Sequence, residues 1–390
     1  MSTKIALLQV NPVVGDIKGN ADLISNLSNI AAQAGASFAV TTELAISGYP
    51  PRDLLLQSDF VSECHNVASN LQTEIPVLVG TPVPPISNRS LPGNGVVRAG
   101  DSVREVTRKQ LLPTYDVFDE ARYFEADERP GIARTIAGLD IGVTICEDAW
   151  QHCGATPNDY DSDPIAQIVE WGRQGVILDA TVNLSASPYH ANKSNARIEV
   201  ARSAAHSLNH PFLLANQVGG NDDLLFDGRS IIAWPDGTVV VGPAWSEGVL
   251  LTDLASPEMC TWIGEGEISI LSPGEELEEN DEDLLDAIII GLSDYCKKSG
   301  IGKIVLGLSG GIDSALAACI ASAAVGSTNV TGISMPSKHS SQHSIDDAKA
   351  TAEALGINFI MQPITDLHQA TDSSLSHILE GGHPVAGENL

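Results

Sequence analysis

The sequence is short of basic residues and of long apolar runs, and both shortages narrow its possible functions. Lysine and arginine together number 21, against 50 aspartates and glutamates, which gives a formal net charge of −29. This excess of acid disfavours a nucleic-acid backbone or an anionic membrane as the main partner. No run of about 18 or more apolar residues occurs, and the opening MSTKIALLQVNP has no basic region followed by an apolar one. We therefore expect no membrane span and no signal peptide.

Cysteine is also scarce, and its spacing excludes two common uses. The six cysteines are scattered and no C-x-x-C motif is present. Cys146 and Cys153 have no matching cysteine or histidine pair at the spacing that zinc sites use. A disulfide framework or a structural zinc site is therefore not expected. Free thiols indicate a cytoplasmic protein.

Apolar stretches alternate with amphipathic ones from residue 3 to about residue 250. Helices are predicted over 20–34 and 195–209. Strands are predicted over 4–10, 37–43, 77–83, 138–146, 175–183 and 211–217. This alternation is typical of a layered α/β fold.

An acidic, turn-rich stretch, SPGEELEENDEDLLD, follows the first region and predicts a solvated linker. We expect a first domain over 1–250, an acidic linker over 251–280 and a second domain over 281–390. In the second domain, helices are predicted over 282–298, 312–325 and 343–355, and strands over 303–309, 329–335 and 358–362. Their order predicts parallel βαβ units.

Three polar residues follow predicted strands of the first domain. Glu43 ends one strand, Lys109 follows another, and Cys146 ends a third. Cys146 alone is typical of a small buried residue, and the adjacent Glu147 and Asp148 disfavour its thiolate. Strand ends of a layered α/β fold meet at one edge, however, so a nucleophile, a base and a cation are expected to come together.

The sequences around these residues carry a resemblance to a known family. ELAISGYPPRDLL, KQLLPTYDVFDEARYF and TICEDAW, in this order, resemble the Glu–Lys–Cys triad of the nitrilase superfamily. More narrowly, they are similar to the glutaminase domain of glutamine-dependent NAD synthetases. The resemblance implies an αββα sandwich in which Glu43 is the general base of Cys146. Lys109 then supplies positive charge and, with a backbone N–H after Cys146, holds the oxyanion.

The same resemblance implies further residues of a glutamine pocket. Tyr115 is expected to line it, and Ser187 and Lys193 in NLSASPYHANKSNAR are expected to hold the amino-acid head group. The family uses a second glutamate near the lysine, and the sequence leaves Glu120 and Glu128 equally open.

KIVLGLSGGIDSALAACIA predicts a strand, a small-residue turn and a helix, an arrangement suited to binding an anion. It is neither a Walker A loop nor a G-x-G-x-x-G fingerprint. It resembles the S-G-G-x-D-S loop of ATP pyrophosphatases, which implies a partial Rossmann-like parallel α/β domain of the adenine nucleotide α-hydrolase-like kind. ATP is then expected as co-substrate, with Mg²⁺ on Asp313. The implied ATP-binding residues are Gly307, Leu308, Ser309, Gly310, Gly311, Ile312, Asp313, Ser314 and Met335.

Together, these resemblances imply a ligase that takes ammonia from glutamine to amidate ATP-activated deamido-NAD(+), giving NAD(+), AMP and pyrophosphate. A homo-oligomer without nucleic-acid or membrane partners is expected. A domain of the second kind needs about 200 residues, so the chain, which ends at HPVAGENL, is interpreted as truncated, with a complete glutaminase set and an incomplete synthetase set. The alternatives are a stand-alone carbon–nitrogen hydrolase with a non-catalytic C-terminal module, and an ATP-binding regulatory protein.

Overall fold

The computed structural model describes residues 3–87, 90–338 and 340–379. It divides into two compact units, Met1–Ala287 and Ile288–Leu390, which are considered separately. The sequence HPVAGENL, on which the expectation of truncation depends, lies outside the described residues. Within them, no helix is both long enough and apolar enough to cross a membrane.

The first unit contains two seven-stranded mixed sheets. In the first sheet, β1, β2 and β3 are parallel neighbours and the remaining pairs are antiparallel. Its strands, in spatial order, are β15 (Thr261–Gly264), β14 (Gly248–Thr252), β1 (Lys4–Gln9), β2 (Ala36–Val40), β3 (Val77–Val83), β4 (Gly93–Ala99) and β5 (Arg104–Arg108).

The second sheet has the same plan, with β7, β8 and β9 as parallel neighbours. Its order is β16 (Ser269–Leu271), β13 (Val239–Val241), β12 (Ile231–Ala233), β9 (Phe212–Asn216), β8 (Ala180–Ser185), β7 (Leu139–Ile145) and β6 (Gly131–Ile136). A separate hairpin joins β10 (Val218–Asn221) to β11 (Leu224–Asp227).

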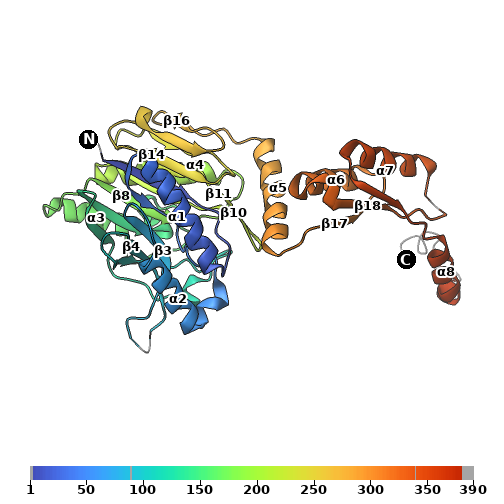
Figure 1. Cartoon of the computed structure of the whole chain (residues 1–390), viewed down its shortest axis with the longest axis horizontal. Helices are drawn as coiled ribbons and strands as arrows, with labels where there is room; N and C mark the ends of the chain where they lie inside the picture. Colours follow the sequence, from blue (N-terminus) through green and yellow to red (C-terminus); the bar gives the residue numbers. More distant parts are fainter. Residues whose placement is uncertain (1–2, 88–89, 339, 380–390) are drawn as a thin grey trace. The chain divides into compact units, whose positions relative to one another are not determined.

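Three apolar layers hold this unit together. The middle layer lies between the two sheets, where Phe38 and Leu78 of one sheet and Val143 and Leu213 of the other are fully buried. The outer layers pack α1 (Ile17–Gln33) and α2 (Ser58–Ser69) on the first sheet, and α3 (Pro164–Arg173) and α4 (Lys193–Leu208) on the second (Figure 1). The predicted αββα sandwich is therefore confirmed.

Short 3₁₀ turns complete the connections. They are η1 (Arg52–Leu56), η2 (Glu120–Arg122), η3 (Cys146–Ala149), η4 (Gln151–Cys153), η5 (Pro257–Met259) and, in the second unit, η6 (Ser327–Asn329).

The stretch 251–280, predicted to be a solvated linker, is instead largely part of the first unit. It contains β15 and β16, and β16 pairs with β13. Leu271 is buried in the apolar layer that α4 covers, and Leu277 packs against the same layer. Burial of apolar side chains is favourable even when the residues around them in the sequence are acidic. Two strands also differ from prediction: β2 ends at Val40, before Glu43, and β8 begins only at Ala180.

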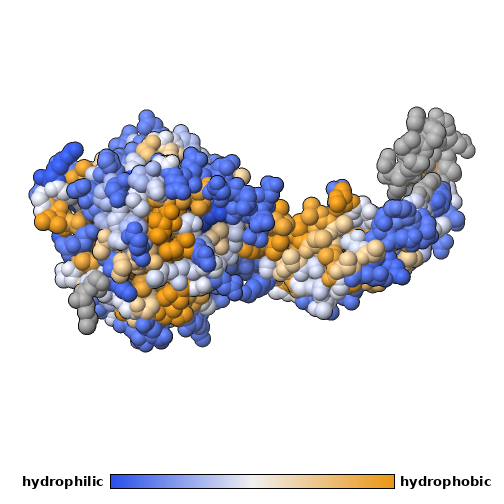
Figure 2. Space-filling view, turned by 90° about the horizontal axis from the view of Figure 1, so that it is seen from above, coloured by the Kyte–Doolittle hydropathy of each residue, from blue (hydrophilic) through white to orange (hydrophobic). Residues whose placement is uncertain are grey.

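In the second unit, β17 (Ile304–Gly307), β18 (Val330–Ser334) and β19 (Asn358–Met361) form a parallel sheet in that order, as predicted. Its helices are α6 (Ile312–Val325), α7 (Gln342–Leu355) and α8 (Thr365–Leu379), while α5 (Asp281–Lys298) begins in the first unit. Its core is small, and Val305 and Ile312 are 65% and 81% exposed. Figure 2 accordingly shows hydrophobic surface gathered on this unit.

Candidate active site

Glu43, Lys109 and Cys146 each lie just past the carboxyl end of a strand in the first unit. Glu43 follows β2 by three residues, Lys109 follows β5 directly, and Cys146 follows β7 and opens η3. Their exposed fractions are 1%, 0% and 5%. The layered fold thus places all three inside the protein at strand ends.

The ammonium of Lys109 lies between two carboxylates. Its Nζ is 2.7 Å from Glu43 Oε1 and 2.8 Å from Glu120 Oε2. Asn94 donates to Glu43 Oε1 at 2.7 Å, and the N–H of Ala186 donates to Glu43 Oε2 at 3.1 Å. Burial lowers the pKa of Lys109, but the charges of Glu120 and Glu43 outweigh this effect and raise that pKa well above its usual value. Lys109 is therefore a fixed cation.

The geometry separates the two glutamates that the sequence left open. Glu120 is 5% exposed and accepts a hydrogen bond from the Tyr49 hydroxyl at 2.8 Å, in addition to its contact with Lys109. Glu128 lies exposed on the surface. Burial raises the pKa of Glu120 to about 7, against the opposing charge of Lys109. Glu120 is the glutamate that belongs to this cluster.

Cys146 has a constrained backbone and a buried thiol. Its φ of 43° lies in the left-handed region, which is costly for a residue with a side chain and is common at functional turns. The Ser185 hydroxyl donates to its Sγ at 3.5 Å. Burial and then the charge of Glu43 raise the pKa of the thiol, while Lys109 lowers it. The thiol form is therefore favoured at rest, with the charges of Glu43 and Lys109 acting on it in opposite directions.

The two acids after Cys146 have separate tasks, neither of which the sequence analysis found. Asp148 accepts the backbone N–H groups of Gln110 and Leu111 through Oδ1, and that of Ile145 through Oδ2, at 2.9–3.0 Å. It thereby ties the loop after Lys109 to the turn of Cys146. In the sequence, only the position of Glu147 and Asp148 directly after the candidate nucleophile indicated that these acids belong to the site.

Glu147 points its carboxylate at two phenols. Its Oε1 accepts from Tyr115 at 2.8 Å and from Tyr160 at 3.1 Å. Burial raises the pKa of Glu147, and these hydrogen bonds oppose that rise. The Glu147 carboxylate, next in sequence to Cys146, is therefore held in place by two tyrosine hydroxyls.

A cavity of about 270 Å³ opens at Cys146. Its lining includes all three predicted pocket residues, Tyr115, Ser187 and Lys193. The Lys193 Nζ lies 5.6 Å from the centre of the Trp150 ring, and burial lowers the pKa of that lysine. The lining also includes residues that sequence reasoning missed, namely Phe118, Glu147, Trp150 and His190.

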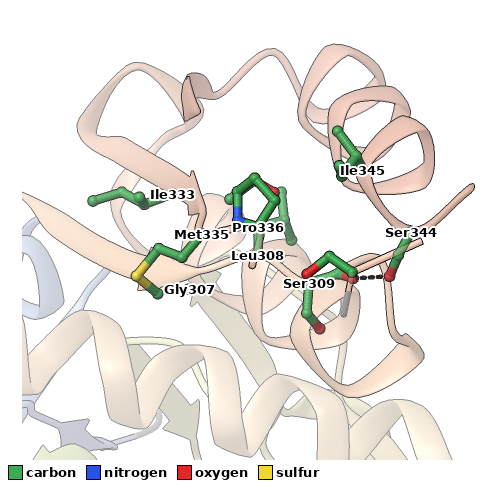
Figure 3. Close-up of a pocket in the computed structure, with 10 residues that line it drawn as sticks. Gly307, Leu308, Ser309, Ile333, Met335, Pro336, Ser344 and Ile345 are labelled. Carbon is green, nitrogen blue, oxygen red and sulfur yellow. Dashed lines mark hydrogen bonds between the residues drawn. The ribbon is translucent and has the colours of Figure 1, made fainter. Parts of the chain in front are cut away.

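A second cavity, of about 310 Å³, lies in the second unit (Figure 3). Of the predicted residues, Gly307, Leu308, Ser309 and Met335 line it. Residues that were not predicted also line it, among them Ser344 and Ile345 of α7. The Ser344 hydroxyl donates to the Ser309 carbonyl at 2.5 Å, which holds the turn against α7.

The other predicted loop residues form the turn into α6 and do not line the cavity. Gly310 has a φ of 78°, and a Cβ there would lie 2.3 Å from the Ser344 carbonyl oxygen, so only glycine fits. Ser314 donates to the Gly311 carbonyl at 2.9 Å and closes the turn. Asp313 is exposed on the first turn of α6, and Gly311 and Ile312 lie beside it.

The layered first unit and the loop of the second match two family models. The Carbon-nitrogen hydrolase model matches residues 4–263, and the NAD synthase model matches residues 284–390. An amidase from Nesterenkonia sp. AN1 shares the first fold, with a TM-score of 0.52 at 20% identity over 65% of this chain and 93% of its own. The chain therefore joins a nitrilase-type hydrolase domain to an NAD synthase domain.

Relatives over nearly the whole chain narrow this class. The glutamine-dependent NAD(+) synthetase of Synechocystis sp. is 38% identical, and that of Aquifex aeolicus 34%, over 99% of this chain and 69% and 70% of their own lengths. The glutamine-dependent NAD+ synthetase of Acinetobacter baumannii, in complex with ADP, is similar over all of this chain and 70% of its own, with a TM-score of 0.84 and 27% identity. The chain belongs to the glutamine-dependent NAD(+) synthetase family.

Proposed function

We propose that Cys146 is the nucleophile that releases ammonia from glutamine, with Glu43 as its general base and Lys109 as the adjacent positive charge. The observation that carries this proposal is the fully buried contact of 2.7 Å between Lys109 and Glu43, beside a thiol that opens onto a cavity. Buried charges are costly unless they are paired, so such a cluster next to a thiol favours a catalytic role.

In the first half of the reaction, Sγ of Cys146 attacks the side-chain amide carbon of glutamine while Glu43 takes the thiol proton. The carbonyl oxygen becomes an oxyanion, which Lys109 and the backbone N–H of Glu147 stabilise. Glu43 then gives its proton to the amide nitrogen, the carbon–nitrogen bond breaks, and ammonia leaves a thioester on Cys146.

In the second half, Glu43 takes a proton from water, and the resulting hydroxide attacks the thioester carbonyl. The carbon–sulfur bond breaks, glutamate leaves, and Cys146 regains its proton. Glu120 does not touch the reacting atoms in this scheme. It positions Lys109, whose Nζ it contacts at 2.8 Å.

The cavity offers both signs of charge that glutamine needs. Lys193 lines it as a partner for the substrate carboxylate, and Ser187 supplies a hydroxyl nearby. The Glu147 carboxylate, held through Oε1 by Tyr115 and Tyr160, is a partner for the substrate ammonium. An amide that lacks these two groups leaves the charges of the pocket unpaired, which favours glutamine over simple amides.

The released ammonia serves the synthetase reaction of this family, which uses ATP to activate the nicotinate carboxylate of deamido-NAD(+). The turn Ser309–Ser314 and the N-terminus of α6 offer backbone N–H groups to a pyrophosphate, and Ser309 and Met335 line the neighbouring cavity. The Acinetobacter baumannii relative is in complex with ADP, which supports the binding of an adenine nucleotide by this family.

Mg²⁺ fits this turn as an ion held mainly by phosphate. No group of three or more histidine, cysteine, aspartate or glutamate side chains in the described part of the chain could hold a metal, and Asp313 is exposed on α6. Mg²⁺ commonly takes one or two carboxylates together with substrate phosphates and water. Asp313 would be that carboxylate, and the ion would neutralise phosphate charge.

The alternative of a stand-alone carbon–nitrogen hydrolase is not favoured. An NAD synthase model matches the second domain, and glutamine-dependent NAD(+) synthetases align with both domains of the chain. The expected homo-oligomer is a further proposal, which light scattering of the purified chain tests.

The test of the glutaminase proposal is Cys146→Ala, assayed for ammonia released from glutamine. Complete loss is expected, with thermal unfolding unchanged. In the unsubstituted chain, a glutamine-mimicking electrophile should alkylate Cys146 before Cys64, Cys153 or Cys260. If Cys153, an exposed thiol, were labelled first, the assignment of Cys146 as the nucleophile would be wrong. For the metal, Asp313→Asn should weaken ATP binding only when Mg²⁺ is present, measured by calorimetry.

A further inference from the structure

Helix α4, whose first residue is Lys193, begins without a cap of its own. The preceding Asn192 has a left-handed backbone, with φ of 67°, and its side chain caps nothing. The first turn contains no acidic residue. Lys193 itself places a positive charge at the positive end of the helix dipole. The start of this helix therefore needs support from elsewhere.

That support comes from the segment 272–283, called the α4 strap below. Glu279 Oε2 accepts the backbone N–H of Asn192 at 2.7 Å. One turn into the helix, the Asn195 side chain donates to the Leu277 carbonyl at 3.0 Å and accepts the Leu277 N–H at 2.8 Å. Leu277 also packs against the apolar layer that α4 covers. The strap thus fixes the residues on both sides of Lys193.

Arg229 joins the strap to the helix a second time. Its guanidinium contacts Asp283 at 2.6 Å and Glu279 at 3.5 Å, and donates to the Ser194 hydroxyl at 2.9 Å. The Arg229 side chain is 7% exposed and Ser194 is 1% exposed, so these bonds are shielded from water. Two strap carboxylates and one arginine hold the residue that follows Lys193.

We infer that the α4 strap is a positioning element of the glutamine pocket, in which Glu279 supplies the missing cap of α4 and so sets the place of Lys193. The inference rests on the proposed role of Lys193 as the partner of the substrate carboxylate. His190 and Lys193 both line the cavity and lie on either side of Asn192. A shift of Asn192 therefore moves two walls of the pocket while the Cys146 cluster stays in place.

The main test compares three variants of the whole chain by their kinetics of ammonia release from glutamine. Glu279→Ala removes the cap, and loss of a cap corresponds to about a five-fold change in an equilibrium. We expect KM for glutamine to rise by about that factor and kcat to stay within about two-fold. Glu279→Gln keeps an oxygen that can accept the Asn192 N–H, and it should restore most of the KM. Glu278→Ala removes the neighbouring exposed glutamate as a matched control and should change neither constant.

Two further measurements separate this inference from the function on which it rests. The rate at which iodoacetamide alkylates Cys146 should be the same in Glu279→Ala and in the unsubstituted chain; a general loosening of the fold would change it and overturn the inference. Lys193→Ala should raise KM by itself. If it does and Glu279→Ala does not, the strap inference alone is wrong. If Lys193→Ala leaves KM unchanged, the binding role of Lys193 is wrong and the inference is overturned with it.

Discussion

The two candidate sites of this molecule differ in the groups that form them and in how far water reaches those groups. In the first unit, Lys109 and Glu43 are charged side chains at 0% and 1% exposure, and each has a charged partner. In the second unit, the turn Ser309–Ser314 offers backbone N–H groups and small side chains near solvent. Water can replace a lost partner at an exposed group but not at a buried charge. The loss of one interaction should therefore cost far more in the first site than in the second.

The largest effect is expected for Lys109→Met, which leaves Glu43 and Glu120 buried without their cation. Loss of a group that stabilises an oxyanion lowers kcat by about 10²- to 10³-fold. Because Lys109 lowers the pKa of Cys146, its removal should also shift thiol alkylation to higher pH. Stopped-flow alkylation across pH and the ammonia assay measure both effects.

Lys349→Met is the control for this variant, because Lys349 forms an exposed pair with Glu353 at 3.7 Å. It should behave like the unsubstituted chain. An alkylation profile for Lys109→Met that matches the profile of this control would remove Lys109 from the mechanism.

In the second site, the largest effect is expected from backbone geometry. Gly310→Ala places a Cβ 2.3 Å from the Ser344 carbonyl oxygen at a φ of 78°. We expect ATP affinity to fall at least about ten-fold, since strain of this kind costs on the order of 1–3 kcal/mol. Ammonia release from glutamine without ATP should not change. Calorimetric titration with ATP measures the first effect.

The neighbouring glycine offers a matched control. Gly311 has an ordinary φ of −83°, and the nearest atom to a Cβ there is Ser309 Oγ at 3.4 Å. Gly311→Ala should therefore bind ATP nearly as well as the unsubstituted chain. Equal losses in the two variants would show that the loop is sensitive to any side chain and not to the backbone conformation of Gly310.

The sequence predicted the parts of this molecule that local pattern and motif determine. Alternating apolar stretches predicted a layered α/β fold and parallel βαβ units, and the family resemblance implied the αββα sandwich; all three are confirmed. Glu43, Lys109 and Tyr115 were found because short motifs surround them. The catalytic and binding roles of these residues stay predictions until they are measured.

What the sequence could not predict depends on contacts between distant segments. Asp148 reaches the backbone of Gln110, and Glu279 reaches Asn192, across 38 and 87 residues of chain. The acidic stretch after residue 250 was interpreted as a spacer because its charges dominate its composition. Nothing in the local sequence shows that two of those acids, Glu279 and Asp283, pair with Arg229. Likewise, Glu120 could be distinguished from Glu128 only by its burial in the folded chain.

A matched pair of serine variants compares the two sites at equal chemistry. Ser185, fully buried, donates to Cys146 Sγ at 3.5 Å, and Ser344 donates to the Ser309 carbonyl in the exposed turn. Ser185→Ala should slow glutamine hydrolysis about ten-fold, because it withdraws a hydrogen bond from a developing thiolate. Ser344→Ala should weaken ATP binding by no more than about three-fold, since water can bond the freed carbonyl. Losses of similar size would contradict the contrast between the sites.

The last expected effect concerns stability and not activity or binding, and it is a pH dependence that arises at the buried site. When all three are ionised, Glu43, Glu120 and Lys109 together place one net negative charge away from water. Burial raises the pKa of Glu120 from 4.5 to about 7. Between these values the folded chain keeps a proton that the unfolded chain has released. Because the folded state binds more protons there, the free energy of unfolding falls as pH rises from about 4.5 to about 7.

Glu120→Gln removes this titration, so its stability should depend less on pH than that of the unsubstituted chain. The difference should reach on the order of 1–3 kcal/mol across the window, which corresponds to several degrees in Tm. Differential scanning calorimetry of both proteins at pH 5 and pH 8 measures it, and the effect of the overall negative charge largely cancels in the comparison. Glu128→Gln, at the exposed glutamate, is the control and should follow the unsubstituted chain. Parallel pH profiles for Glu120→Gln and Glu128→Gln would mean that Glu120 is ionised throughout, and that the buried cluster carries its extra negative charge at every pH in the window.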